Sequence, residues 1–151
     1  WINSNLPIQI FRLPGIYGKG RLPIKRILNG EPVIRKEESR VTNLIHVEDL
    51  ARVVLSAVDN DKLSMVEIIN VSDGNIITST EFYETVCKVM GVKISNYITY
   101  EEAKKIFTEK RLSFLNESRR LNTDKMFRLI PGCIKYSDLK EGIIASMSSE
   151  A

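Results

Sequence analysis

Two apolar segments of strand length, residues 8–13 and 67–71, restrict the fold of this chain more than any other feature of its sequence. The first, IQIFRL, is rich in apolar and aromatic residues and ends at Pro14 and Gly15. Between the two segments, residues 46–60 carry apolar side chains with the three-and-four spacing of an amphipathic helix. Strands that alternate with helices predict an α/β fold with a parallel sheet.

The remaining segments predict short helices around these strands. Thr78 and Glu81 have capping-box spacing at the start of a helix that Gly91 ends. Further helices are expected after Pro23 and over residues 101–111, 123–130 and 137–147, with Asn122 as a cap, a short strand within 95–100, an irregular segment at 31–45 and a loop at 112–120.

Two strands are too few for these helices. A parallel sheet is covered on both faces, so two strands cannot form a complete doubly wound domain. The first residue, Trp1, is not an initiator methionine. We therefore expect the chain to be a piece of something longer, with the missing strands before Trp1.

Composition excludes several classes of protein. The 151 residues are 43% hydrophobic and 27% charged, which is typical of one globular domain. The net charge of +3 arises from 22 basic and 19 acidic residues, a balance too even to indicate a nucleic-acid or membrane partner. Cys87 and Cys133 lack metal-ligand spacing, so we expect buried free thiols, which fits a reducing cytoplasm.

The glycine-rich stretch FRLPGIYGKGR, residues 11–21, does not match a phosphate loop. Gly15, Gly18 and Gly20 give G-x-x-G-x-G, the reverse of the dinucleotide fingerprint, and Lys19 lacks the spacing of a Walker loop. The stretch remains a glycine-rich loop at the carboxyl end of a parallel strand, where open α/β sheets hold ligands. The alternative is that these glycines only turn the chain.

Three segments carry a resemblance to a known family. RLPGIYGKGR at 12–21, NLIHVEDLARVVLSAV at 43–58 and EIINVSDG at 67–74 resemble the second half of an extended short-chain dehydrogenase/reductase of the NAD-dependent epimerase/dehydratase family. Similarity to its atypical YeeZ-like branch of nucleoside-diphosphate-sugar epimerases is carried by TYEEAKK at 99–105, SRRLNTDKM at 118–126 and DLKEGI at 138–143. The match runs in the right order over nearly the whole chain.

The resemblance implies a particular α/β architecture: the C-terminal part of an NAD(P)-binding Rossmann fold with its last parallel strands, plus a small, mostly helical substrate-binding lobe. Residues 1–151 would be the incomplete C-terminal half of one such domain, with the lobe at about 17–45 and 93–151. The N-terminal cofactor-binding half, in which the choice between NAD and NADP is made, would be absent. The parent would act by hydride transfer on a small-molecule substrate. A nucleotide sugar is one candidate that the resemblance implies.

The same resemblance assigns residues to the two sides of a cleft. Leu13, Pro14, Gly15 and Ile16 would pass beside the nicotinamide ring of NAD or NADP, and glycine would leave room for the cofactor. Tyr17 and Arg21 would begin the substrate side. Sugar-nucleotide epimerases commonly carry asparagine where Gly15 stands, and this departure weighs against a sugar-nucleotide substrate.

His46 and Arg120 are the two other candidate substrate-binding residues. In the family, H-V-x-D closes the cleft and starts a helix, with the acid turned toward backbone amides. His46, the only histidine, is then either a structural or cleft-lining residue or, alternatively, a general base. Arg119 and Arg120 are either a bidentate phosphate clamp or a solvated charge pair.

Tyr100 and Lys104 spell the Y-x-x-x-K pair of the family in the wrong place. In the family this pair lies on the helix before the strand that corresponds to IQIFRL, whereas here it lies well after it. We interpret the match as a coincidence. No catalytic or metal-binding residue is therefore assigned to this chain, and we expect it to be inactive without its other half.

Two interpretations from other classes stay open. One is a non-catalytic Rossmann-fold protein that senses a cofactor or binds another protein, since fold alone does not separate it from an enzyme. The other is a self-contained binding module. Its uncovered strand edge would invite pairing with a second copy and give a homodimer.

Overall fold

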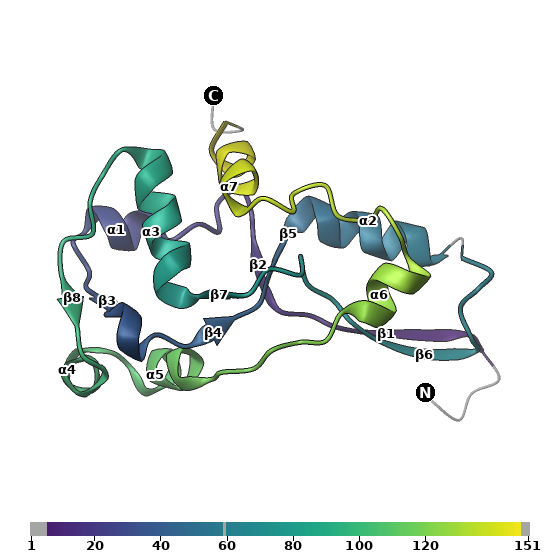
Figure 1. Ribbon diagram of the computed structural model, residues 1–151, viewed down its shortest axis with the longest axis horizontal. Coiled ribbons are helices and arrows are strands. Elements are labelled where there is room, and N and C mark those ends of the chain that lie inside the picture. Colours follow the sequence, from purple (N-terminus) through teal and green to yellow (C-terminus); the bar gives the residue numbers. More distant parts are fainter. Residues whose placement is uncertain (1–5, 59, 149–151) are drawn as a thin grey trace.

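Two parallel strands form one end of the molecule (Figure 1). The computed structural model describes residues 6–58 and 60–148, so Trp1 and the argument drawn from it lie outside the described residues. Strands β1 (Ile8–Arg12) and β6 (Val66–Asn70) pair in parallel, with Ile10 opposite Ile68. Helices α2 (Val47–Val58) and α6 (Asp124–Leu129) pack on this pair, and a hydrophobic core that includes Val53, Ile69 and Met126 joins them.

A second parallel pair continues the first toward the middle of the molecule. Strands β2 (Gly15–Tyr17) and β5 (Leu44–His46) lie with Tyr17 opposite His46. The segment after β6 runs on beside them, because the Val71 N–H donates to the Arg12 carbonyl and the Asp73 N–H donates to the Leu44 carbonyl. These parallel pairs confirm the predicted α/β fold.

Short helices build a lobe at the other end of the molecule (Figure 1). They are α1 (Ile24–Leu28), α3 (Ser79–Met90), α4 (Tyr100–Ile106) and α5 (Glu109–Asn116). Two small strand pairs join them, the parallel pair β3 (Val33–Ile34) with β8 (Tyr97–Ile98) and the antiparallel pair β4 (Val41–Thr42) with β7 (Ile77–Thr78). Helix α7 (Leu139–Ser148) packs against α3 between the two ends.

Both ends of helix α3 follow the sequence signals. The Thr78 hydroxyl accepts a hydrogen bond from the Glu81 N–H, and the Glu81 carboxylate accepts one from the Thr78 N–H. Gly91 ends the helix in the left-handed conformation with φ 70°. The predicted capping box and glycine stop are confirmed.

Three sequence expectations for the lobe were wrong. The segment 31–45 is not irregular, because it contains β3, a 3-10 helix (Lys36–Glu38), β4 and the start of β5. Residues 101–111 do not form one helix. Phe107 is extended at φ −96° and ψ 150°, and the Thr108 hydroxyl accepts from the Arg111 N–H to start a new helix. This helix, α5, also takes up residues 112–116, which we expected in a loop.

The sheet at the β1 end is incomplete among the described residues. Within them β1 pairs only with β6, so its other edge carries unpaired backbone groups. Val66 and Ile68 are 37% and 39% exposed on a face that parallel sheets usually cover. That a cofactor-binding half completes this sheet stays a prediction.

Candidate functional site

Two cavities adjoin at the loop between β1 and β2. The arginine-lined cavity, of about 330 Å³, contains Arg21, Arg26 and Arg111 in its wall. The Pro14 cavity, of about 320 Å³, has Leu13, Pro14 and Arg119 in its wall. Both cavities are lined by Gly15, Thr42 and Phe114.

The four predicted cofactor-side residues lie in the loop after β1 and at the start of β2. Leu13 and Pro14 line the Pro14 cavity, Ile16 lines the arginine-lined cavity, and Gly15 lines both. The Gly15 N–H donates to the Asn43 carbonyl at 3.1 Å. A Cβ at Gly15 would lie 3.0 Å from Leu44 Cδ2 and 3.3 Å from the Asn43 carbonyl oxygen, so close packing on β5 is one physical reason for this glycine.

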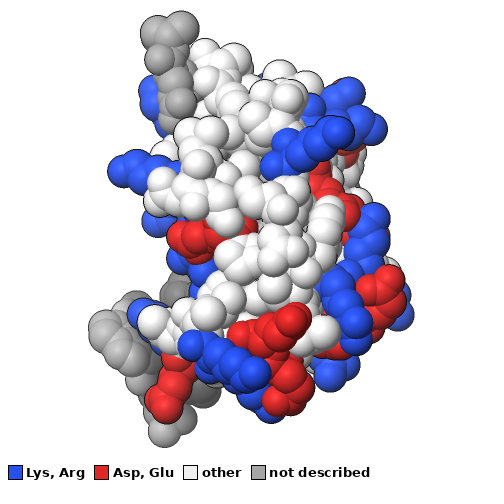
Figure 2. Space-filling model, turned by 90° about the vertical axis from the view of Figure 1, so that its left-hand side faces the viewer, with Lys and Arg blue, Asp and Glu red and all other residues white. Residues whose placement is uncertain are grey.

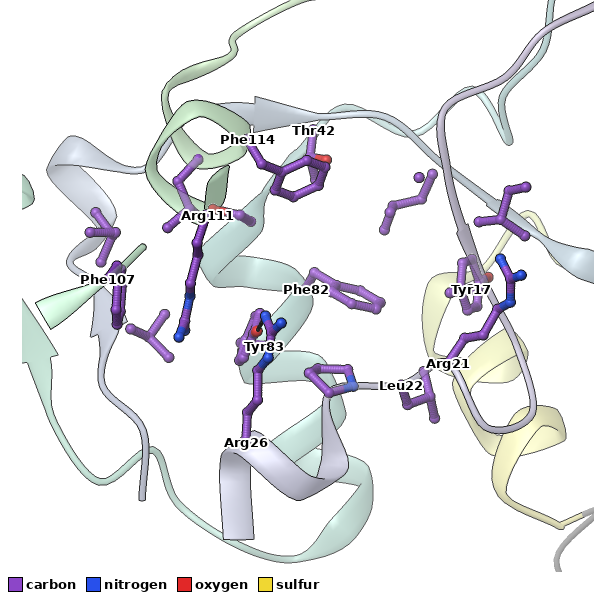
Figure 3. Close-up of a pocket in the computed structure, with 18 of the residues that line it drawn as sticks. Tyr17, Arg21, Leu22, Arg26, Thr42, Phe82, Tyr83, Phe107, Arg111 and Phe114 are labelled. Carbon is purple, nitrogen blue, oxygen red and sulfur yellow. Dashed lines mark hydrogen bonds between the residues drawn. The ribbon is translucent and has the colours of Figure 1, made fainter. Parts of the chain in front are cut away.

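The arginine-lined cavity combines cations with aromatic rings (Figure 3). The Arg111 guanidinium lies 3.6 Å from the centre of the Phe107 ring and pairs with Glu31 at 2.5 Å. Arg26 donates to the Tyr83 hydroxyl at 3.3 Å. Phe82, which precedes Tyr83 in α3, also lines the cavity and packs edge-on against the Tyr83 ring.

The charge of this cavity favours an anionic ligand. The described residues that line it include three arginines and no Asp or Glu, and Glu31, which is not among the lining residues, offsets the charge of Arg111. Arginine binds planar carboxylate and phosphate groups through two parallel hydrogen bonds, and aromatic rings stack on flat ligands. Over the lobe end of the surface, basic and acidic side chains are interspersed around an uncharged band (Figure 2).

Tyr17 lines the arginine-lined cavity, and its hydroxyl points toward Gly142 of α7. The hydroxyl oxygen is buried beside α7 and has no hydrogen-bond partner among the described residues. Burial and, after it, the nearby Asp73 raise the pKa of Tyr17. The ring packs edge-on against His46 and Phe82, with centroids 5.2 and 5.9 Å apart.

His46 lies behind the cavity walls and lines neither cavity. It is 2% exposed, and its Nδ1 accepts from the Glu48 N–H at 3.2 Å, so the side chain caps the start of α2. That hydrogen bond puts the ring proton on Nε2, which donates to the Ser146 hydroxyl at 3.1 Å. Burial lowers the pKa of His46.

Two buried carboxylates lie near Tyr17, and only one has both oxygens hydrogen-bonded among the described residues. Asp49 accepts from the N–H groups of Lys135 and Tyr136, both at 2.9 Å, as expected for an acid turned toward backbone amides. The Asp73 Oδ1 accepts from the Asn75 N–H, whereas its Oδ2 has no partner among the described residues. Burial raises the pKa of Asp73 to about 6.

The two adjacent arginines have different surroundings. Both side chains are exposed. Arg119 lines the Pro14 cavity and bonds to Glu117 at 3.1 Å, whereas Arg120 lines neither cavity. Asn43 anchors this loop, because it donates to the Arg119 carbonyl and accepts from the Leu121 N–H.

Tyr100 and Lys104 lie away from both cavities. The Tyr100 hydroxyl makes a long hydrogen bond of 3.5 Å to the Leu112 carbonyl, and Lys104 pairs with Glu101 at 2.6 Å.

Cys87 and Cys133 are buried free thiols, as predicted. In the described part of the chain, no cluster of three His, Cys, Asp or Glu side chains is placed to hold a metal ion, and no helix is long and apolar enough to cross a membrane.

Sequence reasoning missed the residues that give the arginine-lined cavity its character, because they come from α1, α3 and α5 and from the break between α4 and α5. Phe107 and Arg111 have the i, i+4 spacing of a ring and a cation, a signal that could have been found. No sequence pattern indicated where the helices of the lobe would converge. The missed residues are Arg26, Phe82, Tyr83, Phe107, Arg111 and Phe114.

Comparison with known proteins places the fold. No protein-family model matches the sequence, and no curated protein matches it. A solved structure of a functionally unknown conserved protein from Silicibacter pomeroyi DSS is similar, with 26% identity and a TM-score of 0.81. The similarity covers 96% of this chain and 50% of that one.

Two further solved structures share the fold at lower identity. The human epimerase family protein SDR39U1 (isoform 2), solved with NADPH, has a TM-score of 0.74 at 15% identity over 95% of this chain and 48% of its own. UDP-glucuronic acid 4-epimerase from Bacillus cereus, with UDP-glucuronic acid and NAD, has a TM-score of 0.69 at 19% identity over 96% and 45%. The chain thus spans about half the length of these Rossmann-fold structures.

Proposed function

We propose that this chain is the substrate-binding, C-terminal portion of an NAD(P)-dependent oxidoreductase of the epimerase/dehydratase type. The observation that carries the proposal is the arginine-lined cavity, which adjoins the Pro14 cavity at the carboxyl end of β1. Open α/β sheets hold ligands at this position. The fold similarity to structures solved with NAD or NADPH supports the same assignment.

The cofactor belongs in the Pro14 cavity under this proposal. Leu13, Pro14 and Gly15 form the wall of this cavity that faces the nicotinamide ring, and Ile16 follows them on the side of the arginine-lined cavity. The nicotinamide supplies hydride transfer when the cofactor is bound. The pyrophosphate and adenosine sites lie in a cofactor-binding half that pairs with the free edge of β1. Residues 1–151 alone are then inactive, and the choice between NAD and NADP lies outside them.

The substrate belongs in the arginine-lined cavity, with the ring of Tyr17 and the guanidinium of Arg21 on its wall. A nucleotide sugar suits this wall, since its phosphates pair with arginines and its base stacks on aromatic rings. These features outweigh Gly15, which stands where sugar-nucleotide epimerases commonly carry asparagine. The similar Bacillus cereus epimerase is solved with UDP-glucuronic acid. We place the chain in the YeeZ-like branch on the sequence segments that resemble it.

Titration calorimetry with UDP-glucuronic acid tests the proposal. We expect saturable binding to this chain, weakened roughly tenfold by Arg26→Gln because one charge-assisted contact is lost. Arg128→Gln on the exposed surface of α6 is the matched control and leaves the affinity unchanged. Equal affinities for the wild-type chain and Arg26→Gln would show that the arginine-lined cavity is not the binding site.

A further inference from the structure

Helix α7 has a glycine at the point where it faces Tyr17. Gly142 is buried inside the helix, and a Cβ built on it would lie 2.2 Å from the Tyr17 hydroxyl oxygen and 3.0 Å from Tyr17 Cζ. Glycine lowers the stability of a helix interior relative to alanine, so its presence there requires a reason. The contact with Tyr17 supplies that reason.

Tyr17 lies between α7 and the arginine-lined cavity. Its hydroxyl is buried on the α7 side without a partner among the described residues, and Tyr17 is one of the residues that line the cavity. Phe82 and His46 pack edge-on against the ring. If α7 pushed on the hydroxyl, the open space available to the ring would be the cavity.

Helix α7 is held in place on the same face by other contacts. The Ser146 hydroxyl lies 3.1 Å from His46 Nε2, which joins α7 to the end of β5. Ile143 is fully buried in one core with Val86 and Cys87 of α3. A side chain added at position 142 would therefore displace Tyr17 more easily than it would displace the helix.

We propose that Gly142 is a positioning residue for the arginine-lined cavity. By leaving no side chain opposite the Tyr17 hydroxyl, it lets the Tyr17 ring lie back against α7 and keeps the cavity wide enough for a flat, anionic ligand. This inference rests on the proposed function, in that it takes the cavity as the substrate site. It assigns a determinant of cavity width to a helix that does not line the cavity.

A double-variant cycle between Gly142→Ala and Tyr17→Phe tests the proposal. In the wild-type background we expect Gly142→Ala to weaken UDP-glucuronic acid binding about tenfold. In the Tyr17→Phe background the 2.2 Å contact is gone and the nearest ring atoms lie at 3.0 and 3.1 Å, so the same change should cost under about threefold. Ile144→Ala, on the exposed side of α7, is the control and leaves binding unchanged.

A crystal structure of Gly142→Ala separates this inference from the proposed function. The expected result is a Tyr17 ring displaced into the cavity with α7 in place, a result that needs no ligand. If the wild-type chain does not bind UDP-glucuronic acid, the proposed substrate class fails while ring displacement still supports the positioning role. An undisturbed ring with a shifted α7, or equal effects in both backgrounds, would overturn it.

Discussion

At the scale of single residues, some buried polar groups at the centre of the molecule have hydrogen-bond partners and others have none among the described residues. His46 uses both ring nitrogens, one toward the start of α2 and one toward Ser146 of α7. Asp73 and Tyr17 each leave one buried oxygen without a partner among the described residues. Buried polar groups that lack partners destabilise a fold, and a buried ionisable group links stability to pH.

His46 should make the chain less stable in mild acid. Burial lowers its pKa in the folded state, so below the unfolded value of about 6.5 the unfolded chain binds more protons and the free energy of unfolding falls. We expect His46→Asn, which keeps a capping oxygen, to be less stable at pH 7.5 by about 1–3 kcal/mol because ring packing is lost. Its loss of stability between pH 7.5 and 5.5 in urea unfolding should be smaller than that of the wild type. An unchanged pH dependence would refute the role of His46.

Asp73 should have the opposite pH dependence. Its pKa is raised to about 6, so the folded chain binds the extra proton and stability falls as pH rises from about 4 through 6. Asp73→Asn removes the buried charge and should increase the free energy of unfolding by about 1–2 kcal/mol at pH 7.5. The gain should shrink as the pH is lowered toward 4. A variant that is less stable than the wild type at pH 7.5 would show that the carboxylate is satisfied in solution.

At the scale of helices and strands, local signals predicted some elements and missed others. Helix α3 was predictable because its cap, apolar face and terminal glycine all lie within its own sequence. The break between α4 and α5 was missed because nothing in the sequence distinguishes Thr108 from a polar residue inside a helix. In the structure its hydroxyl accepts from the Arg111 N–H and caps α5. The strands β3 and β4 were missed because each has two residues and is stabilised by a partner distant in sequence.

The Thr78 cap of α3 should contribute to the stability of the site, because this helix supplies Phe82 and Tyr83 to the arginine-lined cavity. Thr78→Ala removes the acceptor for the Glu81 N–H and should lower the free energy of unfolding by about 1 kcal/mol. Thr78→Ser keeps that acceptor and should retain most of the stability. Urea unfolding of the two variants checks this, and equal losses would show that the methyl group rather than the cap is important.

At the scale of the whole molecule, the sequence predicted the fold class but not the site. Parallel strands around a helix follow from periodicity, whereas the arginine-lined cavity depends on how α1, α3 and α5 converge. Among the described residues, one edge of β1 has no strand partner, and Val66 and Ile68 are exposed, so together they form a surface that a partner would cover.

That surface should make the isolated chain self-associate. We expect sedimentation velocity to show dimers or larger species at tens of micromolar, because an uncovered strand edge pairs with other edges. Ile68→Lys places a charge on the exposed face of β6 and should shift the distribution toward monomer. Lys88→Gln on the distant helix α3 serves as the control. A wild-type chain that is monomeric at these concentrations would contradict the expectation.

The most direct test is a pair of calorimetric titrations of this chain, one with UDP-glucuronic acid and one with NADH. We expect saturable binding of the sugar nucleotide, because the arginines and aromatic rings proposed to bind it all line one cavity of this chain. We expect no saturable binding of NADH, because the proposed pyrophosphate and adenosine sites lie outside the chain. Saturable NADH binding, or a sugar nucleotide that does not bind, would contradict the separate roles proposed for the two cavities.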